Sequence, residues 1–173
     1  MSEALNWSYR TTDIPDAGLK EIRTATQVEL AALTAALEVL SCDQLTSDFV
    51  IRGIGGGRFR LAGTLSAQLT QSCVVTLEPI QQTVEGSFDV EFSPVGNLPE
   101  STEDEIEALG AAEIEPIEHG RIDAGRIVFE TLSAAVNPYP RKSGAAFETD
   151  ADDSGAAGQG GPFAALKILK DRG

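Results

Sequence analysis

Two stretches of alternating apolar and polar residues constrain the fold of this 173-residue chain more than any other feature. Over residues 59–70 one side of the alternation is apolar or small, and the interleaved side is mostly polar. Residues 84–92 repeat the pattern. A period of two places one face of a strand inside the protein and the other in water, which is typical of antiparallel sheets. The sequence therefore predicts long antiparallel strands, in a sheet that is either open or curled toward a barrel.

Other segments predict the elements around this sheet. Leu5–Arg10 alternates loosely and predicts a first strand, and 48–53 predicts a strand ahead of a glycine-rich turn. Thr26-Gln-Val-Glu29 has the spacing of a capping box, and leucines at 30, 33, 37 and 40 predict an amphipathic helix over about 26–40. Asp123 is placed to cap a second helix over about 124–136. The predicted fold class is therefore α+β.

The domain organisation follows from a change in composition. Residues 1–142 predict a single α+β domain, since a chain of this length commonly forms one core. Residues 143–161 are rich in Gly, Ala and Asp and predict a flexible linker. Pro162 then opens a predicted short C-terminal helix over 162–173.

The charge of the chain is strongly negative and unevenly distributed. Asp and Glu number 27 against 13 Lys and Arg, a formal net charge of −14, which argues against a broad phosphate-binding surface and against DNA as a partner. No Lys or Arg occurs between Leu61 and Gly120, a segment with twelve Asp and Glu. The carboxylates of this segment are densest at Glu100, Glu103, Asp104, Glu105 and Glu107. This acidic run either keeps the protein soluble or docks onto a basic protein.

The cations gather at two places. Three arginines flank the glycine-rich turn at 53–57, where they either line a solvated strand face or converge on one phosphate-rich partner: Arg52, Arg58 and Arg60. Asn137-Pro-Tyr-Pro-Arg-Lys142 either stops a helix or forms a rigid extended recognition element for a protein or an RNA strand. The latter would present Tyr139 for stacking and offer Arg141 and Lys142 as cations.

No catalytic constellation stands out. His119 is the single histidine, and Cys42 and Cys73 have no partner at metal-ligand spacing, so no metal and no cofactor are expected. The glycines at 53–57 lack the following Lys-Ser/Thr or helix of a nucleotide-binding loop. No segment has the apolar length of a membrane span, and the start has no signal-peptide pattern, so a cytoplasmic protein without a membrane partner is expected.

Four motifs occur in a fixed order along the chain: Cys73-Val-Val-Thr-Leu-Glu-Pro79, Ile122-Asp-Ala-Gly-Arg-Ile-Val128, Asn137-Pro-Tyr-Pro-Arg-Lys142 and Gly161-Pro-Phe-Ala-Ala-Leu-Lys167. Over about residues 5–170 the set resembles the YceD-like family, the large-ribosomal-RNA-subunit accumulation proteins, in its alphaproteobacterial form. The positions that carry the resemblance are Cys73, Asp123, Pro138 and Phe163. Many relatives have a second cysteine in a Cys-x-Arg-Cys-Leu pattern, and some have further cysteines near the end. Here Val75 and Thr76 stand in that pattern and the tail lacks cysteine, which argues against a metal or redox role.

The resemblance implies a bacterial cytoplasmic protein needed for accumulation of large-subunit (23S) ribosomal RNA, with no established enzymatic activity. The expected function is therefore that of a non-enzymatic accessory factor that binds. Its expected partner is a ribosomal protein or a large-subunit precursor, with ribosomal RNA contacted through the local cations. The acidic stretch is expected to point away from RNA or toward a basic ribosomal protein. Two alternatives stay open: an acidic adaptor or inhibitor unrelated to ribosomes, and a small-molecule hydrolase.

Overall fold

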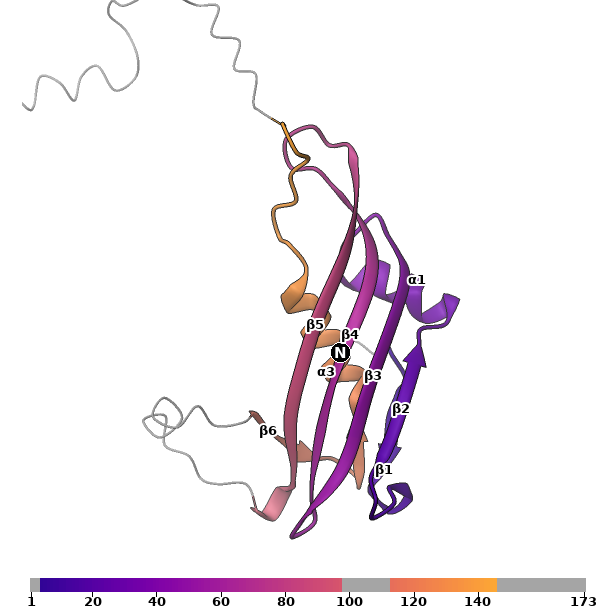
Figure 1. Ribbon diagram of the computed structural model, residues 1–173, viewed down its shortest axis with the longest axis vertical. Helices are drawn as coiled ribbons and strands as arrows, with labels where there is room; N and C mark the ends of the chain where they lie inside the picture. The colour runs from indigo at the N-terminus through magenta and orange to yellow at the C-terminus, as the bar shows by residue number, and fades with distance from the viewer. Residues whose placement is uncertain (1–3, 98–112, 146–173) are drawn as a thin grey trace, which may run out of the picture. The chain divides into compact units, whose positions relative to one another are not determined.

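A computed structural model describes residues 4–97 and 113–145 of the chain (Figure 1). Within the unit Met1–Lys142 the elements follow in this order: β1 (Ser8–Arg10), η1 (Thr11–Asp13), β2 (Leu19–Thr24), α1 (Gln27–Ala36), β3 (Ser41–Gly55), β4 (Arg58–Ser72), β5 (Pro79–Pro94), η2 (Val95–Asn97), β6 (Glu113–Ile117), β7 (Arg121–Asp123) and α3 (Ala124–Ala135). The predicted linker, apart from 143–145, and the predicted helix 162–173 lie outside the described residues, and both stay predictions.

The main sheet has five strands in the order β2-β3-β4-β5-β6. Neighbours from β2 to β5 are antiparallel, and β6 joins β5 in parallel. α1 and α3 lie on the same side of the sheet, with α1 against β3 and α3 against β4 and β5, and no element of the described chain covers the other face (Figure 1). The predicted α+β class with long antiparallel strands is confirmed. The sheet stays open, since β2 and β6 form its two edges in the described chain.

Burial follows the alternation that the sequence shows. On β4, Leu61, Leu65, Ala67 and Leu69 are buried, while the residues between them face solvent or are half-buried. The buried side meets α3, from which Ile127, Val128 and Leu132 enter the same core. The core closes with large side chains from separate elements: Trp7, Phe49, Phe92 and Ile122. One face of the sheet therefore holds the core, and the other is free for contacts.

Both predicted helix starts are confirmed by their caps. The Glu29 N–H donates to the Thr26 hydroxyl at 3.4 Å, and the Thr26 N–H donates to the Glu29 carboxylate at 2.8 Å, which completes the capping box. Asp123 accepts a hydrogen bond from the Arg126 N–H at 3.0 Å and caps α3. This motif residue therefore has a structural role at the start of α3.

The predicted end of the first helix is wrong. α1 stops at Ala36, because Glu38 takes a positive φ of 53° and its N–H bonds to Ala35 O, while the Val39 N–H bonds to Thr34 O. These two bonds form a Schellman cap. Leu40 then donates to Thr70 O at the sheet and is 56% exposed, so it does not belong to the buried leucine stripe.

Several strands also differ from the sequence prediction. The first strand is limited to Ser8–Arg10, and Leu5 and Trp7 before it are core residues. The strand predicted over 48–53 lies in the second half of β3, which begins seven residues earlier, at Ser41. β2, β6 and β7 were not predicted, because charged residues interrupt their short apolar patterns.

Neither α1 nor α3 has the length and hydropathy that crossing a membrane requires, and the described chain has no other helix of that kind.

Candidate functional site

The residues predicted to bind a partner lie at two ends of the sheet. At the hairpin end, where β3 turns into β4, are Arg52, Arg58 and Arg60. At the loop end, where the segment 137–142 meets the loop 73–78 between β4 and β5, are Tyr139, Arg141 and Lys142. β4 spans 15 residues from one end to the other, a distance of about 45 Å at ~3.3 Å per residue (Figure 1). The two ends are therefore separate candidate sites.

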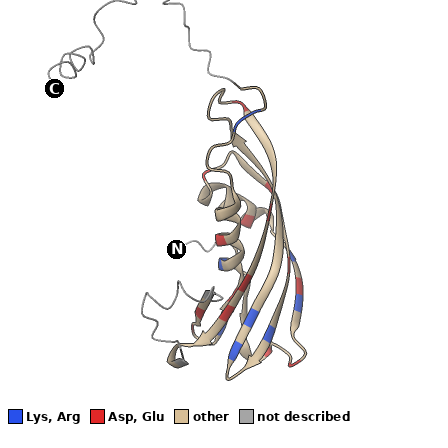
Figure 2. Ribbon diagram, turned by 60° about the vertical axis from the view of Figure 1, so that its left-hand side comes forward, with Lys and Arg blue, Asp and Glu red and all other residues tan. Residues whose placement is uncertain are grey.

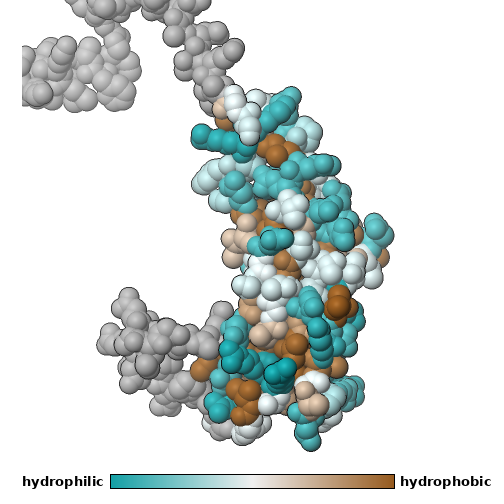
Figure 3. All heavy atoms as spheres, in the orientation of Figure 1, coloured by the Kyte–Doolittle hydropathy of each residue, from teal (hydrophilic) through white to brown (hydrophobic). Residues whose placement is uncertain are grey.

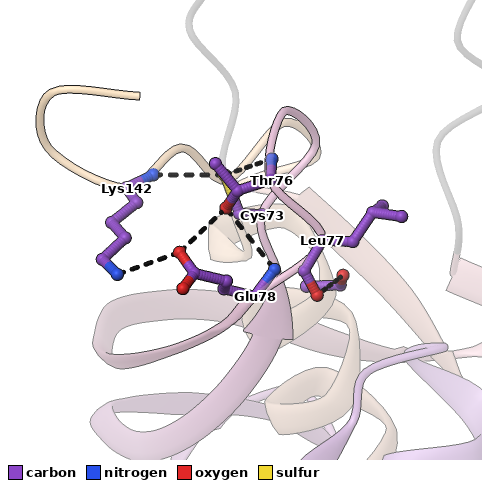
Figure 4. A network of polar contacts seen from close by, with 6 residues as sticks. Cys73, Thr76, Leu77, Glu78 and Lys142 are labelled. Atoms are coloured by element: carbon purple, nitrogen blue, oxygen red, sulfur yellow. Dashed lines mark hydrogen bonds and ion pairs between the residues drawn. The ribbon is translucent and has the colours of Figure 1, made fainter. Parts of the chain in front are cut away.

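Four contacts fasten the segment 137–142 to the end of β4 and the loop that follows it, and one of them is the hydrogen bond from the Lys142 backbone N–H to Cys73 Sγ. The Val74 N–H donates to Pro140 O at 2.9 Å, and the Gln71 side-chain amide donates to Asn137 O at 3.0 Å. Lys142 Nζ lies 2.9 Å from Glu78 Oε2 (Figure 4). Two of the sequence motifs, some sixty residues apart, thus meet in the fold. The chain bends at Pro138 and Tyr139, and the Tyr139 N–H donates to Asn137 Oδ1 at 2.9 Å, so this run is a bent loop after the helix and not the rigid extended element that the sequence also allowed.

Apolar side chains at the loop end are exposed. Leu77 is 76% exposed and Tyr139 is 72% exposed, and Val74 is also exposed. Leu77 has a positive φ of 60°, which costs an L-residue about 1–2 kcal/mol, and no burial of its side chain offsets that cost. Backbone strain and exposed apolar side chains both occur preferentially at functional surfaces, and Leu77 combines the two.

Cys73 lies beneath this surface and is fully buried. Hydrogen bonds from Thr76, first through its hydroxyl, and from the Lys142 backbone N–H lower the pKa of the Cys73 thiol to about 6. The Thr76 and Lys142 nitrogens lie 3.4 and 3.5 Å from its sulfur (Figure 4). Burial, with the Asp43 charge, has the opposite effect on Cys42 and raises the pKa of that thiol to about 11. The sequence carries no signal for the Cys73 environment, because Lys142 is 69 residues away.

The stability of the protein is expected to rise with pH between about 6 and 9 because of Cys73. In this window the folded state holds a thiolate, whereas the unfolded thiol, with its ordinary pKa of 9.0, still binds a proton. The unfolded state binds more protons, so the free energy of unfolding increases with pH, and this contribution is lost as the pH falls through about 6. Urea unfolding across the window should show the rise in the wild type and a flatter profile in Cys73→Ser.

Cys42→Ser is the matched control for this prediction. Its thiol, with a pKa of about 11, stays protonated across the window in the folded state and should leave the slope close to that of the wild type. An unchanged slope in Cys73→Ser would show that the buried sulfur is not ionised in the folded protein.

Two of the three arginines at the hairpin end are engaged by carboxylates of β5. Arg58 Nη1 lies 2.9 Å from Glu91 Oε1. Arg60 binds Asp89 through two hydrogen bonds, Nε to Oδ1 at 2.6 Å and Nη2 to Oδ2. The bonds from Arg60 lower the pKa of the Asp89 carboxyl. Arg58 and Arg60 are therefore less available to an external anion than the sequence indicates.

Cations and carboxylates that are separated along the sequence are neighbours in the fold. β4 pairs with β5 along its whole length, so arginines just before the cation-free stretch lie beside carboxylates within it (Figure 2). Two more carboxylates of the stretch bind cations, Glu78 with Lys142 and Glu115 with Arg126. The predicted acidic docking face at Glu100, Glu103, Asp104, Glu105 and Glu107 lies outside the described residues, as does Phe163.

The structure also places the residues with possible metal or catalytic roles. His119 is an exposed turn residue with a positive φ of 51°, next to Gly120. Across residues 4–97 and 113–145, no group of three or more His, Cys, Asp or Glu side chains is placed to hold a metal ion. The two ends of the sheet are thus the candidate functional sites, and both present groups suited to binding.

Over the described residues these features define a class of protein: an α+β fold with an open, mainly antiparallel sheet and the helices α1 and α3 on one face. Residues 61–170, more than half of the chain, match the model of the family described as large ribosomal RNA subunit accumulation protein YceD. The chain belongs to this family. No curated protein and no solved structure matched the chain.

Proposed function

We propose that this protein is a non-enzymatic accessory factor for the accumulation, processing or stability of large-subunit (23S) ribosomal RNA, and that it acts in the cytoplasm by binding. The role in large-subunit RNA accumulation is what the family description states. The observation that supports binding is the loop end, where exposed Val74, Leu77 and Tyr139 lie on two segments joined by hydrogen bonds. This arrangement is typical of a docking surface, since exposed apolar patches mark interaction sites and tyrosine is enriched among binding hot spots.

The partner proposed for the loop end is a protein component of a large-subunit precursor. At the loop end Glu78 neutralises Lys142, whereas Arg141 has no ion pair with any described residue. Such a surface, apolar with one free guanidinium, suits a protein interface better than a phosphate backbone. The charge of −14 on the whole chain favours a basic ribosomal protein as that component.

Gradient sedimentation of the tagged full-length protein tests this proposal. The protein should co-migrate with large-subunit precursors at low salt, and an apolar contact should persist at moderate salt, because salt screens charge pairs but not apolar burial. Deletion of the gene should lower the amount of 23S relative to 16S ribosomal RNA. Normal ribosomal RNA after deletion, together with recovery of unrelated proteins only, would instead support an acidic adaptor outside the ribosome.

A further inference from the structure

A hollow lies on the solvent-facing side of the sheet beside the hairpin end. Its floor is apolar and comes from Val50, Ile54 and Ala62, and its polar lining comes from Arg52, Arg60 and Asp89. Ile54 is 39% exposed within it. Figure 3 views this side of the sheet, and near its lower end hydrophobic spheres lie directly beside strongly hydrophilic ones. The hollow therefore offers an apolar surface and cations to the same ligand.

The two arginines of the hollow form a like-charge pair. Arg52 and Arg60 are directly opposite each other in the pairing of β3 with β4. Like charges at opposite positions destabilise a sheet. Asp89 binds Arg60 with two hydrogen bonds, whereas Arg52 has no carboxylate partner in the part of the chain that the structure describes. Asp89 thus offsets the charge of Arg60, and the charge open to an external anion is that of Arg52.

The stem of the Arg52 side chain lies against the backbone at Gly18. A Cβ at Gly18 would lie 2.8 Å from Arg52 Cγ, so the stem of the arginine passes directly over this glycine. Gly18 has a φ of +89°, a conformation that glycine adopts without strain. Because this contact limits the positions open to the stem, binding an anion would cost less conformational entropy than it would for a surface arginine without such a contact.

The charge around the hollow matches one phosphate group. The cations on this part of the outer face are Lys20, Arg52, Arg58 and Arg60. The carboxylates Asp48, Asp89 and Glu91 pair with three of them, and the remaining charge is that of Arg52. A phosphodiester carries one negative charge and has two free oxygens that a guanidinium fork can bind.

We infer that this hollow binds one nucleotide of single-stranded RNA, with the phosphate beside Arg52 and Arg60 and the base on the floor of Val50, Ile54 and Ala62. The inference rests on the proposed function, for which it supplies the RNA contact. It also assigns a different role to each end of the sheet, RNA at the hairpin end and protein at the loop end. A single nucleotide contact is compatible with the acidic chain, because it needs no broad basic surface.

Fluorescence anisotropy of the full-length protein with a short labelled oligouridylate tests the inference. Arg52→Ala should weaken binding about tenfold, the usual loss for a charged hydrogen-bond partner, and should reduce the dependence of affinity on salt. Arg52→Lys should bind more weakly than the wild type but more tightly than Arg52→Ala, because it keeps the charge and loses the fork. Ala62→Glu, which fills the hollow without removing a cation, should abolish binding. Thermal unfolding should show that each variant is folded.

Arg10→Ala is the matched control, since it removes an exposed cation from β1, which lies in the separate two-stranded sheet with β7. Equal losses in Arg52→Ala and Arg10→Ala would overturn the inference, because they indicate unspecific charge attraction. Polyglutamate that competes as well as unlabelled RNA would also overturn it in favour of an acidic peptide. If Arg52→Ala binds RNA as tightly as the wild type and the protein still co-migrates with precursors on gradients, the RNA site is rejected and the proposed function stands. If RNA binding depends on Arg52 but ribosomal RNA levels are normal after gene deletion, the proposed function is rejected and the RNA site stands.

Discussion

Replacing Gly63 by alanine is expected to lower the free energy of unfolding by at least about 3 kcal/mol. Gly63 pairs with Phe49 across β3 and β4, and a Cβ at this position would lie 2.5 Å from both Asp48 O and Phe49 Cβ. It would also lie 2.8 Å from Phe49 Cα, so the clash is with backbone and not with a movable side-chain end. The two central strands would have to separate where the fully buried Phe49 covers the glycine. Urea unfolding of the full-length protein measures the loss.

Gly53→Ala is the matched control in the same pair of strands. A Cβ there would have Phe59 Cε1 at 3.9 Å as its nearest neighbour, an ordinary van der Waals contact. Its stability should stay within about 0.5 kcal/mol of the wild type, since alanine also reduces the entropy of the unfolded chain. A Gly63→Ala variant as stable as Gly53→Ala would show that the close approach of β3 and β4 is not required.

The amount of protein recovered with large-subunit precursors is expected to fall at least tenfold in the double variant Leu77→Gly/Tyr139→Ala, while the fold stays intact. Both side chains are exposed, so their loss leaves no cavity in the core. Glycine at position 77 also relieves the positive φ of 60° and should raise the free energy of unfolding by up to about 1 kcal/mol. The expected loss is that of a binding hot spot. Gradient sedimentation and urea unfolding of the same preparation measure the two effects.

Val28→Ala is the control for this loss, since Val28 is 80% exposed on α1, outside both ends of the sheet. It removes exposed apolar surface without touching the loop end and should be recovered with precursors like the wild type. If the double variant is recovered like the wild type, Leu77 and Tyr139 are not part of the docking surface. If Val28→Ala loses as much recovery as the double variant, the association is nonspecific hydrophobic binding and not binding through a defined surface.

The local pattern of residues was enough to predict the parts of the fold that depend on local physics. Alternation over 59–70 marked which side of β4 is buried, because the side-chain direction in a strand repeats every two residues. Thr26 and Asp123 marked both helix starts, because a capping bond spans only three residues. Leu40 shows the limit of this reasoning: its spacing continues the leucine stripe, but the backbone turns at Glu38 and takes it into solvent.

The sequence by itself determined the strand faces, the helix starts and, through four ordered motifs, the family. The tertiary structure alone decided which groups meet. It placed Asp89 and Glu91 beside the arginines, brought Lys142 to Cys73 and left Arg52 without a carboxylate partner among the described residues. These contacts depend on the register between strands and on how distant segments pack, and periodicity within one segment carries no information about either.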